Sequence, residues 1–425
     1  MLRTTGDAEP PAWTADERRK VRALVPALLK WFAAHARDLP WRRTFDPYAI
    51  WISEIMLQQT QVKTVIPYWE RWMRELPDTA ALAAAPQDKV LKLWEGLGYY
   101  TRARNLQKAA RVVMEQHGGK FPRDFAAVLE LPGIGRYTAG AICSIAYDEP
   151  APILDGNVIR VLTRLFGIGE NPREKKTNAR LWQLAEALVR RAASSPSPCA
   201  SSAGRGELYT QERLLSPALS SIQMEERENT CARPASFLNQ SLMELGALVC
   251  APRQPRCEEC PVQKQCIARR EHRIDSLPNL APRATATARR FLAVAAERDG
   301  QWFVRQRPGG VVNAHLWEFP NVELPVEGDG VTAAAKQLIG AHRALKPLVP
   351  IRHTITRYRI LLEAYQAQAT AKATAPRADE RWLSLDELDR LAFTSAHRRI
   401  LQQLRPKTES VPRRERRRRR AGGTV

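Results

Sequence analysis

CAPRQPRCEECPVQKQC, residues 250–266, restricts the fold of this chain more than any other stretch. Its four cysteines, Cys250, Cys257, Cys260 and Cys266, follow the spacing C-x6-C-x2-C-x5-C. Because a short loop cannot bury four free thiols one by one, four thiolates this close normally share a metal centre. Zinc ribbons and fingers usually supply two tight pairs separated by a dozen or more residues. The spacing therefore favours a [4Fe–4S] cluster held by one compact loop.

Length and charge indicate the kind of partner. The 425 residues suffice for two domains, and 66 Lys and Arg against 45 Asp and Glu give a formal net charge of +21. This excess predicts a polyanionic partner. No window is typical of a transmembrane span, the N-terminus lacks an apolar signal core, and the cysteine usage fits a reducing compartment. We expect a cytoplasmic, nucleoid-associated nucleic-acid-binding protein that acts as a monomer without a membrane partner.

Periodicity divides the chain into segments. Helical patterns without a convincing strand occupy the first half, including one that begins at Asp46-Pro47 and continues through about Val62. Strand-like runs mixed with two helices follow Arg290. We expect a flexible N-terminus (1–19), a helical domain (20–193 with 236–270), a flexible Ser/Pro/Gly-rich insertion (194–235), a linker (271–288), a smaller α+β domain (289–405) and a basic tail (406–425).

The stretch Leu131-Pro-Gly-Ile-Gly135 lies between two helical patterns. Glycines at Gly133 and Gly135 would let backbone N–H groups at the start of the second helix approach a phosphate closely. An ordinary helix–helix turn would look the same, but the net charge and the cysteine loop favour DNA. The pattern is typical of a helix–hairpin–helix element, which binds the DNA backbone without reading sequence.

Two carboxylates are candidates for chemistry. Glu54 has Ile50, Trp51 and Leu57 as helical neighbours, so we expect it to be partly desolvated, with a raised pKa suited to a general acid. The alternative is a Glu at the edge of the apolar stripe that reaches solvent. Asp155 precedes an apolar helix, where it is equally well explained as an N-cap or as a carboxylate facing a cleft.

Several long runs in order resemble MutY-type adenine DNA glycosylases, of the helix–hairpin–helix, iron–sulfur superfamily that also contains endonuclease III. They are LPWR (39–42), WISEIMLQQTQV (51–62), LWEGLGYYTRARNL (93–106), LPGIGRYTAGAI (131–142), LDGNVIRVL (154–162) and the cysteine quartet. The resemblance implies an all-α helix–hairpin–helix glycosylase domain with a [4Fe–4S] loop, followed by a smaller α+β Nudix-like domain. It also implies removal of adenine mispaired with 8-oxoguanine or G in double-stranded DNA.

The resemblance also implies roles for individual residues. Glu54 matches the acid that protonates adenine N7, and Asp155 matches the carboxylate that stabilises the oxocarbenium-like sugar. Tyr137 and Asn157 correspond to polar residues beside that sugar. The residues that match the adenine pocket are Arg37, Leu39, Trp41 and Arg42, and those that match contacts around 8-oxoguanine are Gln59, Tyr99 and, in the second domain, Thr356.

Tyr137 also bears on the type of reaction. Bifunctional relatives carry a lysine at this position that attacks the sugar, and a phenol cannot form an imine. We therefore expect base removal without strand scission. Two alternatives remain: a related glycosylase for mismatched thymine or oxidised pyrimidines, and a non-catalytic iron–sulfur DNA-binding protein. The second domain lacks the metal-binding core of Nudix hydrolases, and Ile355 and Arg357 replace the family's Phe and His beside Thr356.

Overall fold

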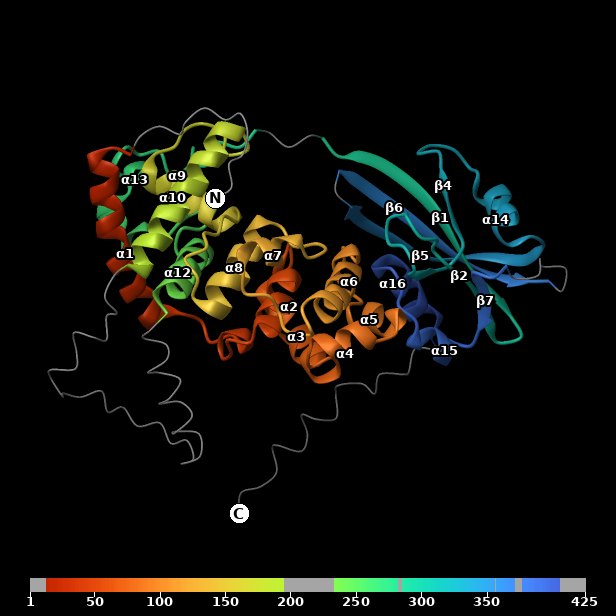
Figure 1. Ribbon diagram of the computed structural model, residues 1–425. Helices are drawn as coiled ribbons and strands as arrows, with labels where there is room; N and C mark the ends of the chain where they lie inside the picture. Colours follow the sequence, from red (N-terminus) through yellow and green to blue (C-terminus); the bar gives the residue numbers. More distant parts are fainter. Residues whose placement is uncertain (1–12, 195–232, 282–284, 356, 371–376, 406–425) are drawn as a thin grey trace, which may run out of the picture. The chain divides into compact units, whose positions relative to one another are not determined.

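The computed structural model describes residues 13–194, 233–281, 285–355, 357–370 and 377–405 (Figure 1). Up to Arg270 the described elements are all helical, and a mixed sheet with helices follows from Thr287, which confirms the expected fold class. Most of the 194–235 insertion, the 406–425 tail and Thr356 lie outside the described residues. Among the helices described, none has the length and apolar character needed to cross a membrane.

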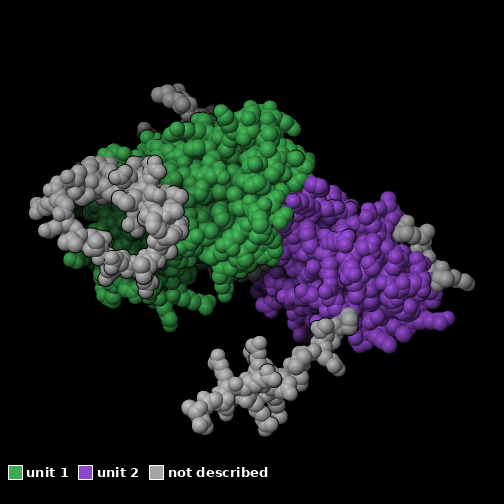
Figure 2. Space-filling view, turned by 90° about the horizontal axis from the view of Figure 1, so that it is seen from below, with its two compact units in different colours: residues 1–85, 104–283 green, residues 86–103, 284–425 purple. Residues whose placement is uncertain are grey.

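Contacts divide the chain into two compact units, coloured separately in Figure 2. The first contains residues 1–85 and 104–283, and the second contains residues 86–103 and 284–425. A short piece of the helical half, residues 86–103, therefore groups with the C-terminal part of the chain. The expected domain boundaries, which were drawn from periodicity, do not separate this piece.

Side-chain caps define where many of the helices begin. Asp46, Asp78, Asp124 and Asp155 each accept backbone N–H groups of the turn that follows. The helices in order are α1 (Ala15–His35), a 3-10 turn (Pro40–Arg42), α2 (Pro47–Leu57), α3 (Val62–Glu75), α4 (Thr79–Ala84), α5 (Gln87–Leu93), α6 (Thr101–Gln116), α7 (Phe125–Glu130), α8 (Arg136–Tyr147), α9 (Gly156–Phe166), α10 (Lys175–Ala193), α12 (Pro234–Leu248), 3-10 turns (Cys257–Glu259 and Gln263–Gln265) and α13 (Ile267–Arg270).

The centre of the first unit is α12, which packs against α1, α8, α9 and α10. Its Leu238 and Leu242 are fully buried, and they share one apolar cluster with Leu28 of α1 and Leu162 of α9. Truncating a buried leucine of this kind to alanine costs about 2–5 kcal/mol. This core holds α8, α9 and α12 in fixed relation, so side chains at their ends are presented on a rigid frame.

The helix that begins at Pro47 ends earlier than its sequence pattern predicts. α2 stops at Leu57, Gln58 leaves the helical conformation (ψ 111°), Gln59 has a positive φ of 56°, and a separate helix begins at Val62. The expectation of one helix through Val62 is therefore wrong. Glutamine favours helices, so local propensity would continue this one. A non-glycine residue with positive φ persists only where surrounding contacts impose it, and such residues cluster at functional sites.

The C-terminal part of the second unit is built on a seven-stranded mixed sheet of order β3-β2-β1-β6-β5, in which β4 also pairs with β1 and β7 with β2. Central β1 pairs in parallel with β6, and its alternate residues enter apolar clusters on opposite faces. One face packs on α14 and the other on α15 and α16, one described helix more than expected. Bounds are β1 (Thr287–Arg298), β2 (Gln301–Gln306), β3 (Trp317–Glu318), β4 (Asn321–Leu324), α14 (Val331–Ile339), β5 (His342–Ile355), β6 (Tyr358–Ala369), β7 (Glu380–Leu383), α15 (Leu385–Arg390) and α16 (Ser395–Leu404).

Candidate active site

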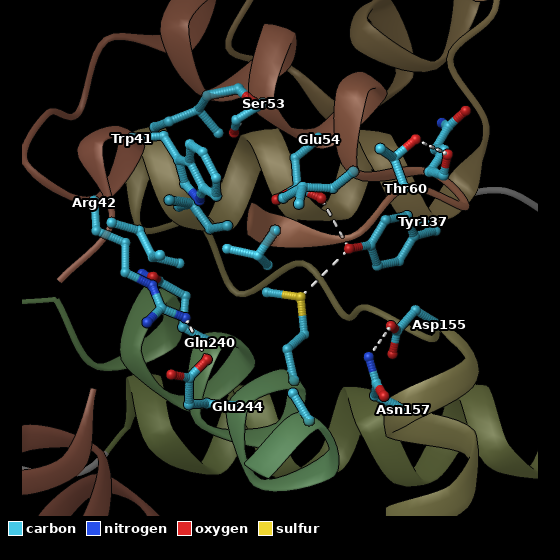
Figure 3. Close-up of a pocket in the computed structure, with 18 of the residues that line it drawn as sticks. Trp41, Arg42, Ser53, Glu54, Thr60, Tyr137, Asp155, Asn157, Gln240 and Glu244 are labelled. Carbon is cyan, nitrogen blue, oxygen red and sulfur yellow. Dashed lines mark hydrogen bonds and ion pairs between the residues drawn. The ribbon is translucent and has the colours of Figure 1, made fainter. Parts of the chain in front are cut away.

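One cavity of the first unit, about 590 Å³ in volume, collects most of the candidate site residues (Figure 3). It is enclosed by residues from α2, α8, the start of α9, α12 and the 3-10 turn at Pro40–Arg42. The candidates that line it are Arg37, Leu39, Trp41, Arg42, Glu54, Gln59, Tyr137, Asp155 and Asn157. A volume of this size can hold a small ring system together with part of a sugar.

Glu54 lies on α2 with only 5% of its surface exposed, which confirms the expected burial. Burial raises the pKa of its carboxyl from 4.5 to about 7, although a hydrogen bond from Tyr137 opposes the shift. The Tyr137 hydroxyl of α8 donates to Glu54 Oε2 at 2.8 Å and lies 3.3 Å from Met243 Sδ. A carboxyl with this pKa can exist as the neutral acid near neutral pH and can return there after giving up its proton.

Asp155 is both a helix N-cap and a carboxylate that faces the cavity, the two roles that the sequence left open. Its Oδ1 accepts the N–H of Val158 at 2.7 Å and caps α9, while Oδ2 accepts from Asn157 Nδ2 at 3.0 Å. The side chain also lines the cavity that Glu54 and Tyr137 line (Figure 3). Burial raises the pKa of Asp155, but the hydrogen bonds from Val158 and Asn157 favour the ionised form and oppose that shift.

Arg160 joins the site to the cysteine loop. Its guanidinium donates to Asn157 Oδ1 (2.8 Å), to the Gly246 carbonyl (2.8 Å) and, through Nε, to the Cys250 carbonyl (2.7 Å). α12 approaches closely here, since a Cβ at Gly246 would lie 2.6 Å from the Asn157 Cβ. The orientation of Asn157, and through it that of Asp155, therefore depends on how the residues around Cys250 are held.

A functional candidate that was not expected from the sequence is Glu244 on α12. Its side chain is 1% exposed, and Arg37 binds it through both Nε (2.7 Å) and Nη2 (2.8 Å), with Arg42 Nη2 at 2.9 Å. Burial opposes ionisation, but the hydrogen bonds from Arg37 and Arg42 outweigh it and lower the pKa of Glu244 to about 2. The sequence contains one indication of a special role for this residue, because Glu244 is the only charged residue among the fifteen of α12.

The remaining candidates lie outside this cavity. Gly133 has a positive φ of 81°, and a Cβ there would meet Asn105 at 2.6 Å, so the hairpin requires glycine at this position. Gly135 is the N-cap of α8 and supplies no side chain to its first N–H groups. Tyr99, in the second unit, is 50% exposed with a φ of 46° and does not line the cavity. Thr356 lies outside the described residues.

Comparisons with known proteins relate this geometry to a family. The sequence profile for the HhH-GPD superfamily of base excision DNA repair proteins matches residues 52–187, and that for the NUDIX domain matches residues 291–403. The adenine DNA glycosylase of Rattus norvegicus is 34% identical over 89% of this chain and 77% of its own length. The chain belongs to the adenine DNA glycosylase family.

Two further adenine DNA glycosylases and one solved structure are also similar to this chain. The adenine DNA glycosylase of Homo sapiens is 32% identical over 90% of this chain and 74% of its own length. The adenine DNA glycosylase of Buchnera aphidicola from Schizaphis graminum is 34% identical over 71% and 75%. Among solved structures, a thermostable thymine-DNA glycosylase aligns with 60% of this chain and 98% of its own, at 28% identity and a TM-score of 0.47.

Members of the HhH-GPD superfamily generally carry a [4Fe–4S] cluster. In this chain the four cysteines of the 250–266 loop line one cavity together with apolar side chains of α9 and α12. Burial and neighbouring thiolates raise the pKa of Cys257 and Cys266, and the pKa of Cys260 rises to about 12. Among the described residues, no group of three or more His, Cys, Asp or Glu is arranged to hold a metal ion.

Proposed function

We propose that this member of the adenine DNA glycosylase family hydrolyses the N-glycosidic bond of adenine mispaired with 8-oxoguanine or G in double-stranded DNA. One observation carries the proposal: Glu54, which can be a neutral acid near neutral pH, and Asp155, the carboxylate that caps α9, line the same cavity. Tyr137 lines it too and donates a hydrogen bond to Glu54. A base inside a duplex cannot reach such a cavity, so the adenine must be flipped out of the stack.

Glu54 acts as the general acid. With a pKa of about 7 it is protonated in a large share of molecules at neutral pH, and it can donate to adenine N7 to turn the base into a leaving group. General acid catalysis contributes about 10²–10⁴ in rate. The Tyr137 hydroxyl donates to Oε2, so it orients the carboxyl and stabilises the carboxylate left after proton transfer.

Asp155 stabilises the positive charge that develops on the sugar as the bond breaks. The Val158 N–H and the Asn157 amide favour its ionised form and fix its direction. Water then adds to C1′ of the oxocarbenium-like sugar and gives its proton to the Glu54 carboxylate, which restores the acid. Asn157 and Tyr137 line the same cavity as Asp155, beside that sugar. Because Tyr137 stands where a nucleophilic lysine would be needed, the product is an abasic site in an intact strand.

The base is held by the part of the cavity around the 3-10 turn. Trp41 and Leu39 are buried and supply apolar walls for a planar ring. Arg37 and Arg42 are both tied to Glu244, which fixes their donors before the base arrives. Pre-positioned groups of this kind avoid part of the entropic cost of binding.

DNA binding and lesion recognition involve other parts of the chain. Gly133 and Gly135 would place the first N–H groups of α8 against a DNA phosphate. We propose that Gln59, Tyr99 and Thr356 contact the base opposite adenine. Gln59 lines the cavity and has a positive φ, and Tyr99 is exposed.

We also propose that Cys250, Cys257, Cys260 and Cys266 hold a [4Fe–4S] cluster. The four thiols line one cavity. Burial, and after it the charge of neighbouring thiolates, raises the pKa values of Cys257, Cys260 and Cys266, which a bound cationic centre would offset. When bound, the cluster supplies the bonds that close the loop, while Arg164, whose Nη1 lies 3.4 Å from Cys250 Sγ, neutralises thiolate charge.

A glycosylase assay tests the proposed activity. Purified protein is incubated under single-turnover conditions with 8-oxoguanine·A, G·A, G·T and A·T duplexes, and the products are separated with and without hot alkali. We expect alkali-dependent breaks at adenine in the first two duplexes only. Release of thymine from G·T with no release of adenine would assign the site to a different glycosylase specificity.

A further inference from the structure

Residues 86–103, which carry Tyr99, are bound to the turn between α15 and α16 within the second unit. Glu95 Oε1 accepts the Phe393 N–H at 2.9 Å, and the Tyr100 hydroxyl donates to the Phe393 carbonyl at 3.2 Å. The backbone N–H and C=O groups of Phe393 are thus both hydrogen-bonded to residues 86–103. Lys92 Nζ adds a third bond, to the Leu391 carbonyl at 2.8 Å.

These bonds are shielded from water. Phe393 is fully buried in an apolar cluster with Phe319 and Ile400, and Tyr100 is 2% exposed. The Glu95 side chain is 12% exposed; its Oε2 accepts from Lys92 Nζ at 2.7 Å and lies 3.8 Å from Arg398 Nε. A buried charged acceptor with several donors makes stronger hydrogen bonds than an exposed one, because water does not compete for it. The attachment is therefore specific and rigid.

The backbone that leads to Tyr99 needs such an attachment. Gly96, Gly98 and Tyr99 have positive φ values of 106°, 71° and 46°, and tyrosine rarely adopts this conformation. Trp94 Nε1 and Arg102 Nη2 both donate to the Gly98 carbonyl, at 3.0 and 3.1 Å. Strained backbone of this kind persists where the surroundings over-determine it. The result is an exposed aromatic ring on a segment that is fixed at its base.

We propose that Glu95 is a positioning residue for Tyr99: by binding the Phe393 peptide, it makes recognition of the base opposite adenine depend on the folded C-terminal domain. The C-terminal sequence thus contributes to discrimination through residues 86–103, besides any direct contact of its own. The proposal rests on the proposed function, because it takes Tyr99 as a contact to the base opposite adenine.

Single-turnover excision rates on 8-oxoguanine·A and G·A duplexes, measured with the full-length protein, test this proposal. Glu95→Ala should lower the ratio of the two rates about five- to tenfold, which corresponds to about 1–1.4 kcal/mol. Glu95→Gln keeps an oxygen that can accept the Phe393 N–H and should restore much of the ratio. Asp389→Asn is the matched control, since Asp389 pairs with the same Arg398 (3.4 Å) from α15; its ratio should stay within about twofold of wild type.

A double-mutant cycle with Tyr99→Ala separates positioning from general destabilisation. If Glu95 acts through Tyr99, Glu95→Ala should change the ratio no further once Tyr99 is alanine. An equal loss in both backgrounds would overturn the proposal. If Glu95→Ala does not fold, Tyr100→Phe, which removes only one hydroxyl, should still lower the ratio about threefold, roughly 0.7 kcal/mol.

Two negative results have different meanings. If Glu95→Ala excises adenine normally and its ratio of rates is unchanged, the inference is refuted and the proposed function stays intact. The same holds for Tyr100→Phe if the alanine variant does not fold. Failure of the wild-type protein to release adenine from either duplex would refute the proposed function itself.

Discussion

The Tyr137 hydroxyl donates a 2.8 Å hydrogen bond to Glu54 Oε2, although the two residues are 83 positions apart in the chain. Burial pushes the Glu54 carboxyl toward its neutral form, and this hydrogen bond partly offsets that effect. The balance leaves the pKa at about 7, between the value of an exposed carboxyl and that of an unassisted buried one.

Glu54→Gln should lower the adenine excision rate by at least about 10², because an amide cannot donate a proton as an acid does. In the wild type the rate should fall as pH rises through about 7, because only the protonated carboxyl is active. Single-turnover rates from pH 5 to 9 check both points. Glu75→Gln, on an exposed part of α3, should behave as wild type, and a flat wild-type profile would argue against Glu54 as the acid.

Tyr137→Phe should move the alkaline limb of the same profile to higher pH. The Tyr137 hydroxyl stabilises the ionised carboxylate, so its removal leaves the neutral acid more favoured and raises the pKa of Glu54 further. The measurement is the pH–rate profile of the variant beside that of the wild type. A limb displaced to lower pH would mean that the hydroxyl stabilises the protonated acid instead, by accepting a hydrogen bond from the carboxyl O–H of Glu54.

Tyr137→Lys should gain the ability to cleave the strand. An amine at this position can attack the sugar and form an imine, whereas the phenol cannot. Borohydride should trap the variant on DNA that contains 8-oxoguanine·A and should not trap the wild type. Efficient trapping of the wild-type protein would contradict the monofunctional assignment.

The purified protein should be brown, absorb broadly near about 400 nm, and contain about four irons per chain. Cys260→Ala should lose most of the iron and be poorly soluble, because the loop around it is closed by the metal centre. Cys143→Ala, a buried cysteine outside the 250–266 loop, is the control and should keep its iron. Metal analysis that finds one zinc per chain would replace the iron–sulfur assignment.

Arg160→Gln should lower both the stability of the protein and the rate of excision. The shorter side chain cannot reach the carbonyls of both Gly246 and Cys250, and each buried acceptor left without a donor costs about 1–3 kcal/mol. We expect a lower melting temperature and slower excision, because Asn157 loses the group that orients it. Arg190→Gln, at an exposed pair on α10, should change stability by less than about 0.5 kcal/mol.

Local sequence patterns were sufficient to predict the features that depend on residues close together in the chain. The spacing of the four cysteines predicts that one compact loop carries all four thiols, and all four line one cavity. Apolar neighbours one helical turn away predict the burial of Glu54, and an Asp before an apolar helix predicts the cap made by Asp155. Loop length sets the spacing of the cysteines, and helical geometry sets the apolar stripe and the cap, so these features can be predicted without knowledge of distant contacts.

Tertiary structure decided the features that join distant parts of the chain. Glu244 meets Arg37 across 207 positions, which no local period encodes. The break at Gln59 opposes helix propensity and is imposed by its surroundings. Residues 86–103 have the sequence pattern of an ordinary helix and loop. Glu95 and Tyr100 nevertheless form hydrogen bonds with the backbone of Phe393, almost 300 positions later in the chain. Hydrogen bonds of this kind depend on where the packed core places each backbone, and sequence patterns describe only what each segment does by itself.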